Sequence, residues 1–78
     1  MKKLEIYLVE FYTKGTNAEI RFAWVTVENR SQVEPLLRHR IRIFDEIITC
    51  EQQSHIVELQ TSKPVWSLEY GNYSTSTL

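Results

Sequence analysis

Three segments near the start of the chain decide the fold: LEIYLVEFYT (residues 4–13), KGTN (residues 14–17) and EIRFAWVTVE (residues 19–28). The first and last are rich in aromatic and β-branched residues and flank a polar segment with a glycine, which is typical of a β-hairpin. Pairing Thr13 with Ala18 sorts the side chains onto two faces, because successive residues of a strand point to opposite sides of the sheet.

Both faces of this predicted hairpin are apolar. One face carries an aliphatic row, namely Leu4, Ile6, Leu8, Ala23, Val25 and Val27. The other face carries an aromatic row, namely Tyr7, Val9, Phe11, Ile20, Phe22 and Trp24. A hairpin with one face in water alternates apolar and polar residues, so the aromatic face must be covered.

Three covers are open for the aromatic face: the remainder of the chain, a second copy, or another macromolecule. Leaving its large side chains in water would forgo on the order of 10 kcal/mol, comparable to the whole stability of a small domain. Aromatic side chains are also favoured anchors at protein interfaces. We therefore expect Tyr7, Phe11, Phe22 and Trp24 to bind a protein partner, with a homodimer as one form of that contact.

The middle of the chain changes to a helical period. Apolar residues recur at three- and four-residue spacing, at Val33, Leu36, Leu37, Ile41, Phe44 and Ile48. Residues 31–34 have the form of a capping box at the start of such a helix. An alternative ends the helix near Arg42 and makes residues 43–50 a strand, which their β-branched residues support. We favour the helix, because Phe44 and Ile48 continue the stripe.

A second hairpin is predicted from residues 55–60 and 65–70, which flank a polar turn with a proline at residues 61–64. The expected fold is therefore α+β: a two-layer sandwich with one helix across an antiparallel four-stranded sheet, in the order ββαββ. We expect residues 1–70 to form the single domain and residues 71–78 to form a flexible tail. Whether the second hairpin covers the aromatic face is left open.

Composition narrows the class of protein. The 78 residues carry a net charge of −1, whereas general nucleic-acid binders show a basic excess. The chain lacks an apolar run long enough to span a membrane, so we expect no membrane contact. A single cysteine, Cys50, does not make a disulfide scaffold and favours a reducing compartment, so we expect a cytoplasmic protein.

One basic cluster stands out, RHRIR at residues 38–42. On a helix Arg38 and Arg42 share one side, where they are either solvated and paired with nearby acids or available to an acidic partner. We count both as a possible second contact for protein. The alternative function is an accessory binder of single-stranded nucleic acid, which would use the aromatic face plus Arg38, Arg40 and Arg42. No basic row flanks the aromatic residues, so this interpretation is less favoured.

Signals of catalysis are weak in this sequence. The two histidines, His39 and His55, lie in separate predicted elements, and with Cys50 they do not make a four-ligand metal site. Two glycines are too few for a glycine-rich phosphate loop. We therefore expect no catalytic residues, no metal and no cofactor. The sequence predicts a small non-enzymatic protein-binding module, such as an adaptor, inhibitor or assembly factor.

Overall fold

The computed structural model describes residues 3–71 of the chain. Its elements are β1 (Glu5–Thr13), β2 (Ile20–Val27), the short 3-10 helix η1 (Arg30–Gln32), α1 (Val33–Arg40), β3 (Phe44–Gln53) and β4 (Trp66–Glu69). They form a four-stranded sheet in the order β3-β1-β2-β4. The α+β class and the ββαββ order are confirmed, but an all-antiparallel sheet is wrong, because β4 runs parallel to β2. The predicted tail lies outside the described residues beyond Gly71.

The β1–β2 hairpin is one residue out of the predicted register. Tyr12 pairs with Ile20, and the turn occupies residues 14–18 instead of 14–17. Thr13 and Glu19 close this longer turn: the Thr13 amide donates to the Glu19 carbonyl at 2.9 Å, and the Glu19 amide donates to Thr13 Oγ1 at 2.8 Å. Gly15 supplies the left-handed backbone the turn requires, with a φ of +108°.

This single-residue shift redistributes the two apolar rows. Tyr7, Val9 and Phe11 now share a face with the aliphatic residues of β2, and that face is the core face. Phe22 and Trp24 instead share the opposite face, here called the outer face, with Ile6 and Leu8 of β1. Both faces are apolar as expected, but the grouping of Tyr7, Val9 and Phe11 with Phe22 and Trp24 on one face is wrong, because a slip of one residue exchanges the partners of one strand.

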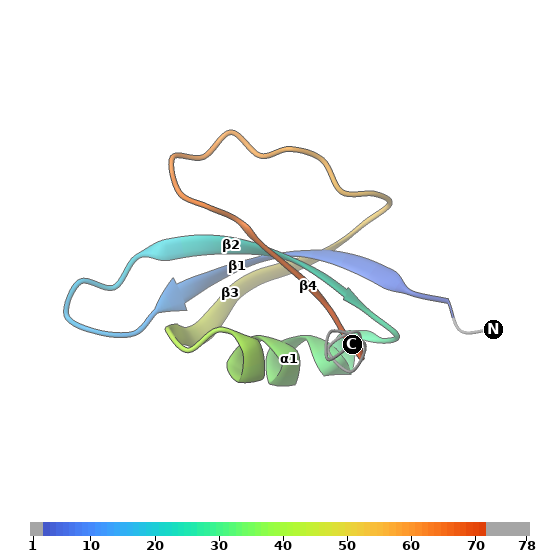
Figure 1. Cartoon of the computed structure of the whole chain (residues 1–78), viewed down its shortest axis with the longest axis horizontal. Helices are drawn as coiled ribbons and strands as arrows, with labels where there is room; N and C mark the ends of the chain where they lie inside the picture. Colours follow the sequence, from blue (N-terminus) through green and yellow to red (C-terminus); the bar gives the residue numbers. More distant parts are fainter. Residues whose placement is uncertain (1–2, 72–78) are drawn as a thin grey trace, which may run out of the picture.

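Helix α1 lies against the core face of the sheet (Figure 1). Its buried residues Val33, Leu36 and Leu37 pack into a core that comprises Tyr7, Val9, Phe11, Ala23, Val25, Val27, Ile41, Phe44 and Leu68. The capping box begins two residues before the predicted one: Asn29 accepts from the Ser31 amide at 3.0 Å, and Gln32 Oε1 accepts from the Asn29 amide at 3.2 Å. These bonds satisfy the first free amides of the helical segment.

The helix ends at Arg40, so the favoured helical interpretation of residues 41–48 is wrong and the strand alternative is right. The pairing of β3 with β1 shifts twice, at Ile48 and at Asp45, where an extra residue bulges. As a result the core-facing positions of β3 recur every three residues at Phe44, Ile47 and Cys50. Two β-bulges thereby give a strand the apolar spacing of a helix.

The second predicted hairpin is also wrong. Residues 54–65, here called the strap, contain no strand and arch over the outer face, on the side of the sheet opposite α1 (Figure 1). Only Trp66–Glu69 forms a strand, and it pairs with β2 at the far edge from β3. Because β3 and β4 both run parallel to β2, a tight turn cannot join them, and a long crossing connection is needed.

The register makes a direct prediction about stability. Phe11 is 0% exposed and contacts Phe44 and Trp66, with ring centroids 5.5 and 5.8 Å apart. Phe11→Ala should lower the free energy of unfolding by about 3–5 kcal/mol, because it removes a large core side chain. Urea unfolding followed by far-UV circular dichroism measures this loss.

The neighbouring residue provides the matched control. Tyr12 lies on the outer face and is 42% exposed, so Tyr12→Ala should cost less than about 1 kcal/mol. Equal losses for the two variants would contradict the assignment of Phe11 to the core face.

Candidate functional site

The structure separates the residues that the sequence grouped into one contact surface. Tyr7 and Phe11 lie in the core, at 5% and 0% exposure. Trp24 is 5% exposed on the outer face, and Phe22 beside it is half-buried. These four side chains therefore do not form one exposed patch, because the register puts two on each face. The aromatic cluster that the structure does contain is internal and combines Phe11 with Phe44 and Trp66.

The strap covers part of the outer face. Together with Trp24 and Ser67, its residues line an open cavity of about 510 Å³. An ion pair between Lys63 and Glu19 anchors the strap to the start of β2. Arg21 adds a hydrogen bond from its guanidinium to the Pro64 carbonyl at 3.1 Å. The chain's own remainder thus buries Trp24, which is the first of the three covers considered from sequence.

The two arginines of the predicted second contact differ in their surroundings. Arg38 pairs with Glu34 at 2.6 Å, one helical turn away, and its guanidinium lies 5.0 Å from the centroid of the Phe44 ring. Arg42 is exposed in the short connection between α1 and β3. Neither residue lies on the outer face with Phe22 and Trp24, so the structure does not join the basic cluster to these aromatic residues.

The longest open feature of the sheet is the edge formed by β3. This strand pairs with β1 on one side, and no other described strand pairs with its second side. Residues 49–53 continue the pairing with residues 6–10 without a bulge, whereas Asp45 and Ile48 interrupt it earlier in the strand. An edge strand presents unpaired N–H and C=O groups that can take another strand. The regular part of this edge is therefore residues 49–53.

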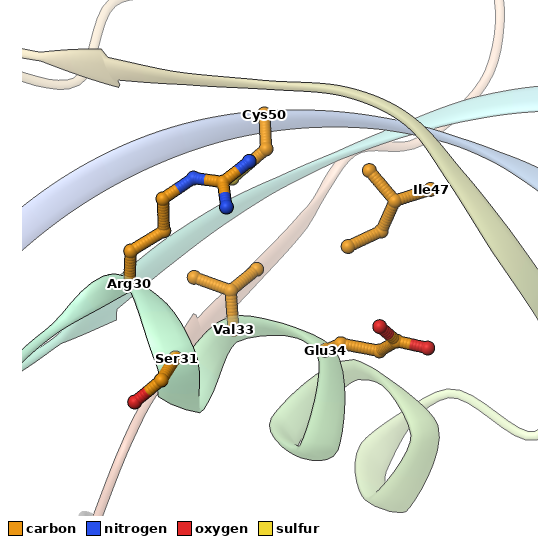
Figure 2. A pocket seen from close by; sticks show the side chains of 6 residues that line it. All are labelled: Arg30, Ser31, Val33, Glu34, Ile47 and Cys50. Carbon is orange, nitrogen blue, oxygen red and sulfur yellow. The ribbon is translucent and has the colours of Figure 1, made fainter.

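A groove runs beside this edge, between β3 and the start of the helical segment (Figure 2). Its volume is about 290 Å³, and it is lined by Arg30, Ser31, Val33, Glu34, Ile47 and Cys50. Val33 and Ile47 form its apolar part, and the Arg30 guanidinium reaches across to the Cys50 side chain (Figure 2). The groove therefore combines an apolar floor with a cation at one end.

Cys50 is a half-buried free thiol in this groove. Burial raises the pKa of the thiol, and the nearby Arg30 guanidinium offsets part of that rise. A thiol that stays protonated at neutral pH is a poor nucleophile.

The strands at this edge carry acids and no bases. Neither β1 nor β3 contains a lysine or an arginine. Glu46 and Glu51 of β3 pair with Tyr12 and Leu8, so both glutamates face outward with them. Glu10 lies on the same face and accepts a hydrogen bond from Thr49 Oγ1 at 3.3 Å. The outer side of the β3 edge is therefore acidic.

Sequence reasoning missed Arg30, Cys50 and the β3 edge as parts of one site. The available signal was the β-branched run at residues 43–50, which supported the strand alternative. Because those residues were interpreted as helix, Cys50 was expected near a helix end, and the edge strand β3 was not predicted. Within residues 3–71, no group of histidine, cysteine and acidic side chains could hold a metal ion, and no helix is long and apolar enough to cross a membrane.

Comparison of the chain with protein families, with curated proteins and with solved structures finds no match in any of the three.

The strap anchor predicts a pH dependence. The hydrogen bond from Lys63 holds the pKa of Glu19 below its ordinary value. A lowered pKa means that the anchor contributes at neutral pH and is lost as the pH falls through the pKa of Glu19 in the folded chain. Acrylamide quenching of Trp24, measured in a Trp66→Phe background, should rise over that acidic range while far-UV circular dichroism stays constant.

Two variants check the origin of this effect. Glu19→Gln should increase quenching of Trp24 already at pH 7, about three pH units above the ordinary pKa of a glutamate. Glu58→Gln should leave quenching unchanged, because Glu58 is an exposed strap carboxylate that pairs with no described residue. Quenching that is independent of Glu19 would mean that the ion pair does not hold the strap.

Proposed function

We propose that this chain is a non-enzymatic protein-binding module that accepts an extended segment of another protein as an added strand along the β3 edge. The observation that carries the proposal is the open side of a ten-residue edge strand that lies next to a groove. In strand addition, backbone hydrogen bonds provide the affinity, and pockets beside the edge select alternate side chains. The open side of β3 and the groove beside it support this mode of recognition.

The regular edge is short, which sets the expected strength of binding. Each backbone hydrogen bond contributes about 0.5–1.5 kcal/mol net, and ordering the added segment costs part of the sum. About five such bonds sum to roughly 5 kcal/mol before that cost, so a strand paired along residues 49–53 alone would bind no more tightly than about 10⁻³ M. Side-chain contacts therefore decide which segments bind tightly enough to be partners.

Charge favours a basic segment on the outer side of the edge. Glu10, Glu46 and Glu51 lie on the outer face, and neither strand that carries them has a base. Opposite charges on neighbouring strands contribute about 0.2–1 kcal/mol per pair. The partner strand should therefore carry lysine or arginine at positions that point to the outer face.

The same acids disfavour pairing between two copies of β3. Such a dimer would bring Asp45, Glu46 and Glu51 of both chains together, and like charges on neighbouring strands are destabilising. They also oppose nucleic acid on this face, because phosphates repel carboxylates. A protein segment with the opposite charge is the occupant that the edge supports best.

A short peptide of alternating lysine and valine tests the proposal. Its addition should shift the amide NMR signals of residues 49–53 and of the groove, and should slow alkylation of Cys50 by iodoacetamide. Glu51→Lys should weaken this binding about threefold to tenfold, because it replaces an attraction by a repulsion. Glu58→Lys carries the same charge change on the strap and should leave the affinity unchanged.

A peptide of the same composition with its lysines and valines shuffled is the second control. Without alternation it cannot direct its lysines to one face of an added strand. Equal binding of the two peptides, or an equal effect of Glu51→Lys and Glu58→Lys, would show general charge attraction and contradict strand addition.

A further inference from the structure

We infer that the groove beside β3 selects an acidic side chain, aspartate or glutamate, at the position of the added strand that lies next to Cys50. This inference rests on the proposed strand addition and names its specificity. Side chains of an added strand would alternate between the outer face and the groove, since successive residues point to opposite sides. The outer side carries glutamates and no base, whereas the groove side carries both Arg30 and Glu34, so the two sets of partner side chains experience different electrostatic surroundings.

The charge of the groove comes from Arg30. Glu34 also lines the groove, but its carboxylate is paired with Arg38 at 2.6 Å. Arg30 is the only lysine or arginine among the lining residues, and its guanidinium lies at the Cys50 end (Figure 2). A guanidinium presents two parallel N–H donors that match the two oxygens of a carboxylate. An arginine therefore binds a carboxylate side chain specifically.

The lining of the groove suits a side chain that has both methylene groups and a charged end. Val33 and Ile47 offer apolar contact to methylene groups that lead from the added backbone toward Arg30. A phosphorylated side chain carries nearly two negative charges, and sites for it use clusters of arginines, whereas this groove has one. The observations therefore favour a carboxylate.

Position along the strand distinguishes a side chain from a chain terminus. Cys50 lies inside the regular edge, and β3 continues past it to Gln53. We take the partner segment to continue past the residue next to Cys50 in both directions, toward Ile47 and toward Gln53. The carboxylate at Arg30 is thus carried by a side chain within the segment and not by a terminal residue.

Two peptides that differ in one side chain test this inference. Both alternate lysine on one side with valine on the other, and the central inward residue is glutamate in one and glutamine in the other. The glutamate peptide should bind the wild-type chain about tenfold more tightly, because a charge-assisted hydrogen bond replaces a neutral one. Titration monitored by amide NMR provides both dissociation constants and shows whether the signals of residues 49–53 move.

Charge reversal identifies the residue responsible. Arg30→Glu should abolish the preference for the glutamate peptide and favour a third peptide with lysine at the central position. Arg40→Glu makes the same charge change at the last residue of α1, outside the groove lining, and should keep the wild-type preference. Arg30 is exposed, and Arg30→Gln provides a neutral second variant that should bind the glutamate and glutamine peptides equally.

The outcomes separate the two proposals. If both peptides bind at residues 49–53 with equal affinity, the selection of an acid by Arg30 is wrong while strand addition stands. If the preference survives Arg30→Glu, another group makes it and the inference is again overturned. If none of the peptides moves the signals of residues 49–53, strand addition itself is wrong and the specificity falls with it.

Discussion

The hydrogen bonds between Thr13 and Glu19 set the register of the β1–β2 hairpin, and the rest of the structure depends on that register. They close a turn over residues 14–18, which places Phe11 beneath the helix and Trp24 on the outer face. A turn shorter by one residue would exchange the partners of one strand. This turn therefore determines which side chains α1 covers and which side chains the strap covers.

Much of the fold is readable from the sequence, and the errors have local physical causes. The two first strands, the helix after them and the order of elements follow from apolar periodicity and polar breaks. Turn length does not, because a glycine with polar neighbours suits closure after either four or five residues. In β3 the predicted helical stripe relied on Phe44 and Ile48, but Ile48 lies at a bulge and is exposed, so its spacing from Phe44 does not mark one buried face. The strap was predicted as a strand because its apolar and polar residues alternate. In the structure no neighbouring strand pairs with it, so it forms none.

The candidate site was harder to predict than the fold. It depends on which strand is at the edge, and strand order is a property of the whole sheet and not of any segment. Arg30 precedes the helix and Cys50 lies on a distant strand, so nothing in their sequence context links them. Of the four aromatic residues that looked like contact anchors, Tyr7 and Phe11 lie in the core, whereas Phe22 and Trp24 lie on the outer face. Large apolar side chains signal burial, and in a domain this small the chain itself is the first available cover.

The two edges of the sheet differ in length, and this difference limits how molecules can associate. β3 presents ten residues, whereas β4 presents four and is followed at once by a turn. A sheet with long free strands at both ends can add subunits without limit, which is how fibres grow. The four residues of β4 offer few backbone groups to a further strand, so the two ends of the sheet are unequal in their capacity for growth.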